Sequence, residues 1–511
     1  MNSQIPQHGL QGQSLATGAA HRPRILPRPI DAVVIPTANR PTNLLGCLNG
    51  VIANALVHGH RPEIFIADGS TDPISCSRNE DIARTISRRY SIAIRLIGST
   101  AKHDLIEYLV LHGIDRDLCS FALAGNGFIK LPLAGANRNI LLLSTVGKRA
   151  LSLDDDVVCE FTRPSCIEGF GSSCPRVSGG FEGAPYRYWF FKDESELFVR
   201  VPRVDLDLLG VHAEILGSSQ IHAGSDIYPE EHSHEGDVVH LTLNGFLGDC
   251  GWGTPSRYLF LEDDSFLRLT KDRVAYQALI QSRSIVQLSP KLFCGSNIDG
   301  MMAGTFAVSS DVLSPPFPPA GRGEDRVFGR LFSKFHPRGR ICVLPFAIGH
   351  WPPTKRRFWS GEITRSAGTW DLSTFLVYLL NASELSGDSD TTRISCFGAQ
   401  IERIGLQSVA EFRQMLVGFH ILALGNVKTF LESRLARFSS MNGDSRRDIE
   451  AYLRKLVTRE QVEDAAIPME FLYYFEPDRA IRELQTMVYE FGRLLSCWPR
   501  MCELSGQFKT D

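Results

Sequence analysis

The sequence lacks several patterns that mark particular protein classes. Its twelve cysteines include no Cys-x-x-Cys pair, which favours reduced, mainly buried thiols over a disulfide framework or a zinc site. No uninterrupted apolar stretch approaches the roughly 18–20 residues that a membrane-spanning helix needs, so we expect no transmembrane segment. No long basic run is present and the net charge is −3, so neither nucleic acid nor an anionic membrane surface is expected as the main partner.

The N-terminal residues also lack the charged start and apolar centre of a secretory signal. Residues 1–29 are instead rich in Gln, Gly, Ser and Pro, and we expect them to be disordered. No internal repeat is apparent. Together with the cysteine pattern, these absences predict a cytoplasmic protein.

What the sequence does contain, over its first 160 residues, is an alternation of strand-like and helix-like segments. Strands are expected at residues 31–36, 63–67, 91–97 and 150–153, and helices at 41–57, 78–90, 102–114 and from about Ala136. This alternation predicts an α/β fold with a mainly parallel sheet flanked by helices. From about residue 370 the periodicity is helical, so a helical C-terminal region is expected.

Three consecutive acids follow the last of these strands, in the stretch RALSLDDDVV at residues 149–158. Asp154, Asp155 and Asp156 repel one another unless they hold a cation or face solvent. Carboxylate oxygens are hard ligands that suit Mg²⁺ or Mn²⁺, and Mg²⁺ usually takes one or two carboxylates and shares substrate phosphates. The alternative is a solvated acidic turn or a helix N-terminus. Because ligands of parallel sheets bind beyond the carboxyl ends of the strands, the acids lie where a crevice is expected.

Four short motifs occur in order over residues 35–157: IPTANRP, IADGSTD, GANRN and LDDDV. In this order they resemble the nucleotide-sugar half of GT-A glycosyltransferases, especially family 2-like enzymes. The resemblance covers residues 30–160 and returns at 291–350. It implies a GT-A type (Rossmann-like) fold that holds a nucleoside-diphosphate sugar and Mn²⁺ or Mg²⁺.

The resemblance assigns residues at the strand ends to the donor site. Pro36 and Thr37 match the end of the first strand, which lines the nucleotide pocket. Asp68 matches the acid that contacts the base, and Arg138 matches the basic residue of an Ala-Arg-Asn segment, with Asn137 where Ala is usual. Without the resemblance, Asp68 is a turn-forming residue and Arg138 a solvated helix arginine.

The same resemblance implies a metal site. Asp154 would face the ribose and the metal, and Asp156 would coordinate the metal, while Asp155 belongs to the donor site without a defined role. His350, at the end of the apolar run ICVLPFAI, would complete the ligand set. Its alternative is a histidine packed in the core beside Trp351.

A second acidic segment, GRGEDRVFG at residues 321–329, supplies the candidate base. Inverting transfer needs a carboxylate that takes the proton of the acceptor hydroxyl. Asp325 is the first choice for this role and Glu324 the second. The alternative is an acidic first turn of a helix, which the helix dipole stabilises in any case.

These assignments predict a metal-dependent glycosyltransferase that moves a sugar from a UDP- or GDP-sugar to an acceptor hydroxyl with inversion. The acceptor stays open between a glycan, a lipid-linked sugar, a small metabolite and a peptide. We expect the donor half at residues 30–160, the acceptor half at 161–365 and the helical region at 366–511. Two other functions stay open: a sugar-nucleotide pyrophosphorylase, and a non-catalytic binding module on a transferase fold.

Three further charged clusters have weaker interpretations. EEHSHEGDVVH, with His232, His234 and His240, is expected to be a surface loop. FLEDDSF, with Asp263 and Asp264, is expected to be a loop or helix start rather than a rival metal site. The run at residues 355–357 either neutralises a diphosphate or is solvated.

Overall fold

The structure is a computed structural model that describes most of the chain. The described residues are 27–164, 186–191, 198–201, 203–219, 227–228, 237–290, 292–297, 301–354, 356–359, 361–439, 441–460 and 463–508. Some expectations fall on residues outside these ranges, namely those for residues 1–26, His232, His234 and Lys355.

The N-terminal half is an α/β unit that follows the predicted alternation closely. Its strands are β1 (Ala32–Thr37), β2 (Glu63–Asp68), β3 (Ile94–Ile97) and β4 (Ala150–Leu153), and its helices are α1 (Pro41–Val57), α2 (Pro73–Tyr90), α3 (Ser99–Leu111), α4 (Arg116–Ala124) and α5 (Ala134–Ser144). The four strands are parallel in the order β3-β2-β1-β4. Helix α4 was not predicted.

The alternation of side chains along β1 shows how the sheet separates two cores. Val33 and Ile35 pack with α1, α2 and α7 (Leu208–Ile215) on one face. Ala32 and Val34 pack on the other face, in the core that also includes α3, α4 and α5. Both faces of the sheet are therefore covered, as expected for parallel strands.

The sheet continues beyond β4 with mixed strand directions. The added strands are β5 (Val157–Pro164), β6 (Arg187–Phe190), β7 (Phe198–Val201), β8 (Ile227–Tyr228), β9 (Val238–Asp249), β10 (Ser284–Leu288), β11 (Leu292–Gly295), β12 (Thr305–Val308) and β13 (Gly339–His350). β12 runs antiparallel to both β4 and β9, whereas β13 is parallel to β9.

The prediction of a mainly parallel sheet is therefore wrong beyond β4. Only residues 154–156 separate β4 from β5, and a parallel crossover needs a dozen residues or more. The turn that carries the three acids thus also ends the parallel part of the sheet. The broader predictions of an α/β fold and a helical C-terminal region are confirmed.

The acidic run FLEDDSF lies at a helix start, as expected. The helical elements of residues 255–335 are η2 (Pro255–Phe260), α8 (Asp263–Leu269), α9 (Arg273–Leu279) and α10 (Glu324–Phe335). Glu262 caps α8 by accepting hydrogen bonds from the Ser265 amide at 2.9 and 2.8 Å. Asp263 pairs with Arg434 at 3.1 Å. This acidic run therefore stabilises a helix end and an interface between distant segments.

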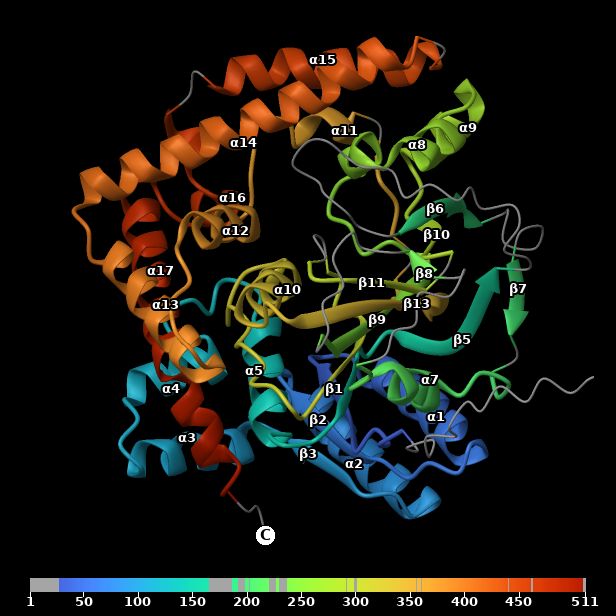
Figure 1. Cartoon of the computed structure of the whole chain (residues 1–511), viewed down its shortest axis with the longest axis vertical. Helices are drawn as coiled ribbons and strands as arrows, with labels where there is room; N and C mark the ends of the chain where they lie inside the picture. The colour runs from blue at the N-terminus through green and yellow to red at the C-terminus, as the bar shows by residue number, and fades with distance from the viewer. Residues whose placement is uncertain are drawn as a thin grey trace, which may run out of the picture.

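The C-terminal helices form a layer against the α/β half (Figure 1). They are α11 (Glu362–Arg365), α12 (Leu372–Ala382), α13 (Asp390–Gly405), α14 (Val409–Arg437), α15 (Gly443–Glu460), η3 (Glu463–Ala466), α16 (Met469–Leu472) and α17 (Pro477–Ser505). α17 packs against α13 and also reaches α3, α4 and α5. The helical region therefore shares a core with the sheet instead of forming a separate body.

Among the described residues, α14 alone has the length and composition of a membrane span, although the sequence analysis found no such stretch. Of its most apolar window, 28% is buried. Long core helices of soluble proteins pass the same test, so this single helix is weak evidence for a membrane. The absence of a transmembrane segment stays a prediction.

One cysteine pair departs from the expectation of reduced thiols. Cys294 on β11 lies directly opposite Cys342 on β13, and the two form a disulfide. Their sequence separation of 48 residues hid this pairing, which depends on strand register. The other eight cysteines in the described part of the chain are free.

Candidate functional site

The turn between β4 and β5 lies beside the ends of the first two strands. β1 pairs with both β2 and β4, so the carboxyl ends of all three strands meet at one edge of the sheet. There the Thr37 hydroxyl donates a 2.7 Å hydrogen bond to Asp155. The ends of β1 and β4, which the resemblance assigns to the donor site, therefore lie next to each other.

The loops of the first two motifs are tied to each other. Asn39, which has a left-handed backbone (φ 56°), accepts hydrogen bonds from the amides of Thr71 and Asp72, both at 3.0 Å. The backbone amide of Asn39 donates a hydrogen bond to the Ser70 hydroxyl at 2.7 Å. These bonds explain why both loops carry short polar residues and fix the rim of the site.

The three acids of the turn are compensated by cations from distant segments. Asp154 pairs with Arg138 at 2.6 Å. Arg40 lies 3.2 Å from Asp155 and 3.4 Å from Asp156. Arg40 was not among the predicted site residues, although it belongs to the IPTANRP motif, because nothing in the sequence showed which way its side chain turns.

Burial and pairing set the pKa values of these acids in opposite directions. Burial raises the pKa of Asp155 to about 7, against the hydrogen bond from Thr37 and the charge of Arg40. Burial also opposes ionisation of Asp156, but its hydrogen bond and ion pair with His350 lower its pKa overall. The turn therefore holds acids with different affinities for protons.

His350 occupies the end of β13 and faces the acids. Its Nε2 lies 3.2 Å from Asp156, and its Nδ1 donates to the Asp249 carbonyl at 2.6 Å. Burial alone would lower the pKa of His350, but the bond and charge of Asp156 outweigh burial and raise it to about 9. The imidazole is therefore oriented on one side by the backbone and on the other by an acid.

Arg138 connects the two acidic segments of the sequence. Its side chain is 7% exposed and lies 3.4 Å from Glu324, in addition to its bond with Asp154. It also lies over the ring of Phe317. The alternative of a solvated helix arginine is thus wrong, because Arg138 is buried between carboxylates of the 154–156 turn and of α10.

The candidate bases lie at the first turn of α10. Asp325 accepts hydrogen bonds from the amides of Ala303 at 3.1 Å and Arg326 at 2.8 Å. Burial, with the charge of Asp325, raises the pKa of Glu324 to about 7. Gly323 has a left-handed backbone (φ 75°), and a Cβ there would lie 2.5 Å from the Ser373 hydroxyl, so glycine is required where the helix approaches α12.

Asp68 is less accessible than its assignment implied. Its two carboxylate oxygens accept hydrogen bonds from the Ser70 amide at 2.8 Å and from Asn79 at 2.9 Å. Pro36, Thr37 and Gly69 line the adjoining cavity, whereas Asp68 does not. A contact between Asp68 and the nucleotide base stays a prediction.

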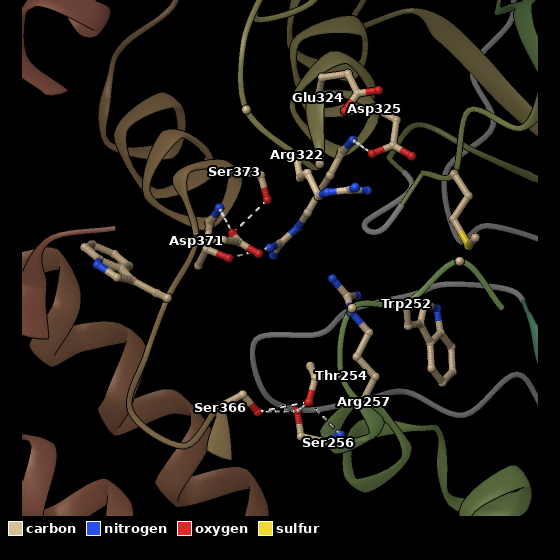
Figure 2. A pocket seen from close by; sticks show the side chains of 18 of the residues that line it. Trp252, Thr254, Ser256, Arg257, Arg322, Glu324, Asp325, Ser366, Asp371 and Ser373 are labelled. Atoms are coloured by element: carbon tan, nitrogen blue, oxygen red, sulfur yellow. Dashed lines mark hydrogen bonds between the residues drawn. The ribbon is translucent and has the colours of Figure 1, made fainter. Parts of the chain in front are cut away.

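A single large cavity runs from the acids to the C-terminal helices. Its volume is about 2650 Å³, several times the roughly 300–1,000 Å³ of an ordinary ligand pocket. One end, here called the acid end, is lined by Asp154, Asp155, Asp156, Glu324, Asp325 and His350. The cavity extends past η2 to α12, α14, α15 and α16, and Figure 2 shows the part that includes Glu324, Asp325 and η2.

Two other sequence clusters have structural roles instead. Arg356 pairs with Asp249 at 2.9 Å, so it is held in place and is not a freely solvated charge. His240 lies on β9, so the expectation of a surface loop is wrong for this residue; it is half-buried near His336, and burial lowers its pKa to about 4. Within the described residues, no group of three His, Cys, Asp or Glu side chains is arranged to hold a metal ion by itself.

No family model and no curated protein matches the chain.

Proposed function

We propose that the protein is a metal-dependent glycosyltransferase of GT-A type that transfers a sugar from a UDP- or GDP-sugar to an acceptor hydroxyl with inversion. The observation that supports this proposal best is the acid end itself. Acids from residues 154–156 and from residues 324–325 converge there with His350. The acid end lies beyond the carboxyl ends of parallel strands, where such sheets bind ligands.

Asp154, Asp156 and His350 would hold Mn²⁺ or Mg²⁺. Carboxylates are hard ligands for these ions, and a backbone carbonyl that fixes Nδ1 is the usual second contact of a metal-binding histidine. Bound there, the ion would act as a Lewis acid that neutralises the departing diphosphate. Because these side chains pair with other groups of the chain and no described residues form a complete ligand set, donor phosphates would supply the remaining ligands.

Arg40 and Arg138 both neutralise the acids before a cation binds, but they differ in burial. The side chain of Arg40 is 49% exposed, so it can leave Asp155 and Asp156 at little cost. Arg138 is buried and stays with Asp154 and Glu324, which keeps both carboxylates oriented. The site would therefore bind its cation by displacing one arginine and retaining the other.

Asp325 is the proposed base. Two backbone amides donate to its carboxylate and hold it in place, and in the proposed reaction this carboxylate would take a proton from the acceptor hydroxyl. Glu324 is the weaker choice because Arg138 already engages its carboxylate and its pKa lies near 7. The roles of both acids rest on the proposed transfer reaction.

Thermal unfolding with UDP or GDP, each with Mn²⁺, tests the donor site. A nucleotide that binds the native state raises the melting temperature as its concentration increases. We expect this rise in the wild type and not in Asp156→Ala. Asp81→Ala is the matched control, because Asp81 is an exposed acid on α2, outside the cavity. If neither nucleotide stabilises the wild type, the donor site is refuted.

Product analysis separates this function from the two that the sequence left open. A transferase with Mn²⁺ releases nucleoside diphosphate slowly from its sugar donor, whereas a binding module releases none. A pyrophosphorylase would instead form nucleoside triphosphate when pyrophosphate is added.

A further inference from the structure

Two arginines extend into the cavity beyond the acid end and form no hydrogen bond or ion pair in the described part of the chain. Arg257 lies on η2, and Arg322 lies two residues before Glu324. Both side chains are exposed and line the cavity. Figure 2 shows them reaching into the same open space from opposite sides. We call this place the arginine end.

The carboxylates nearest the arginine end are already engaged by the protein backbone. Asp371 caps α12 by accepting from the Thr374 amide at 2.7 Å and from the Ser373 hydroxyl at 2.8 Å. Glu470 accepts from the Leu372 amide at 3.1 Å. Asp371 acts electrostatically on Arg257, and Glu470 on Arg322. Neither acid is within ion-pair distance of these arginines among the described residues, so both guanidinium groups can still donate hydrogen bonds to a ligand.

The arginines of the acid end, in contrast, are all engaged. Arg40 and Arg138 pair with the acids of the 154–156 turn, and Arg356 pairs with Asp249. A diphosphate at the acid end would meet these cations and the metal. The arginine end is therefore a separate source of positive charge, on the side of the cavity that faces α12.

We infer that the arginine end binds a phosphate group carried by the acceptor. The guanidinium fork matches the geometry of phosphate oxygens, and two forks that approach from opposite sides match a phosphate dianion better than a single carboxylate. Because Arg322 lies so close in sequence to Asp325, a phosphate held there would keep the rest of the acceptor near the proposed base. This inference rests on the proposed function, since it names the acceptor class of the same site.

Titration calorimetry on the full-length protein tests the inference without any donor present. The probes are glycerol 3-phosphate, glycerate and glycerol, which carry a phosphate, a carboxylate and no charge. Phosphatidylcholine vesicles with and without phosphatidic acid form a further pair, which separates a lipid phosphate from a soluble one. The variants are the double substitution R257Q/R322Q and the control R61Q, which removes an exposed arginine outside the cavity.

We expect glycerol 3-phosphate or the phosphatidic acid vesicles to bind the wild type and R61Q equally, and R257Q/R322Q at least 10-fold more weakly. The inference is overturned if neither phosphate probe binds the wild type, if glycerate binds as well as the phosphate, or if the double variant keeps full affinity. It is also overturned if the double substitution weakens binding of UDP or GDP with Mn²⁺ and spares the phosphate probe.

The same titrations separate this inference from the proposed function. If the phosphate probe binds through the arginines but neither UDP nor GDP binds with Mn²⁺, the donor site fails and the arginine end remains an anion site. If a nucleotide binds and requires Asp156 but no phosphate probe binds, only the acceptor inference is lost.

Discussion

At the acid end of the cavity, each carboxylate of the 154–156 turn has a hydrogen bond or ion pair within the chain. At the arginine end, Arg257 and Arg322 form neither among the described residues. Asp155 and Asp156 are buried and Asp154 is partly buried, and a buried charge is costly unless it is paired. The arginines are exposed and solvated, so they need no partner for stability. The acid end would therefore bind a cation in exchange for the ion pairs of Arg40, whereas the arginine end would bind a ligand without losing any ion pair.

The largest effect is expected at the proposed base. Asp325→Asn keeps the shape of the side chain but removes its proton acceptor, so transfer should fall by about 10³-fold. Nucleotide affinity should stay within twofold. Steady-state kinetics and a parallel nucleotide titration measure the two quantities. Asp264→Asn serves as the control, since Asp264 also lines the cavity but lies on α8. Unchanged turnover in Asp325→Asn would remove Asp325 from the mechanism.

The difference in charge pairing should appear directly in stability. Arg138→Met leaves Asp154 and Glu324 without their shared buried cation, and should lower the free energy of unfolding by about 3 kcal/mol. Arg322→Met removes an exposed arginine that forms no ion pair, and should change the free energy of unfolding by no more than about 0.5 kcal/mol. Urea unfolding of both variants measures the contrast. If both variants lost the same free energy of unfolding, the acid end and the arginine end would not differ in how their charges are paired.

A smaller, pH-dependent effect is expected from Glu470, near the arginine end. Burial and then the charge of Asp371 raise its pKa to about 7. Its stabilising contribution is therefore complete below its unfolded pKa near 4.5 and is lost as the pH rises through about 7. With partial exposure taken into account, this loss is about 2 kcal/mol between pH 5 and pH 8.

Glu470→Gln should remove this part of the pH dependence, because the amide oxygen can still accept from Leu372 but does not titrate. Urea unfolding at pH 5 and pH 8 measures the change, with the exposed Glu80→Gln as control. The assignment fails if the wild type and Glu470→Gln lose the same stability between the two pH values.

The N-terminal half of the fold could be predicted from the sequence because its information is local. Apolar runs such as DAVVIP at residues 31–36 predicted the strands, and their alternation with helices predicted that these strands are parallel. The antiparallel part could not be predicted, since the pairing of β12 with β4 and β9 depends on segments far apart in the chain. The disulfide between Cys294 and Cys342 was missed for the same reason.

The candidate site shows the same division between local and distant information. The motifs located Thr37, Arg138 and the three acids, and the structure brings these residues together. Arg40 was missed because its role depends on the direction of its side chain. Arg257 was missed because it belongs to no motif and matters only through its position opposite Arg322 across the cavity.

The most direct test of the account is anomalous diffraction from crystals of the protein soaked with MnCl₂ and UDP or GDP. We expect a manganese peak within coordination distance of Asp156, with His350 or Asp154 as a further ligand and nucleotide phosphates beside the ion. We also expect Arg40 to be displaced from Asp155 and Asp156. A nucleotide bound without manganese at these acids, or a manganese peak only at Asp263 and Asp264, would contradict the account.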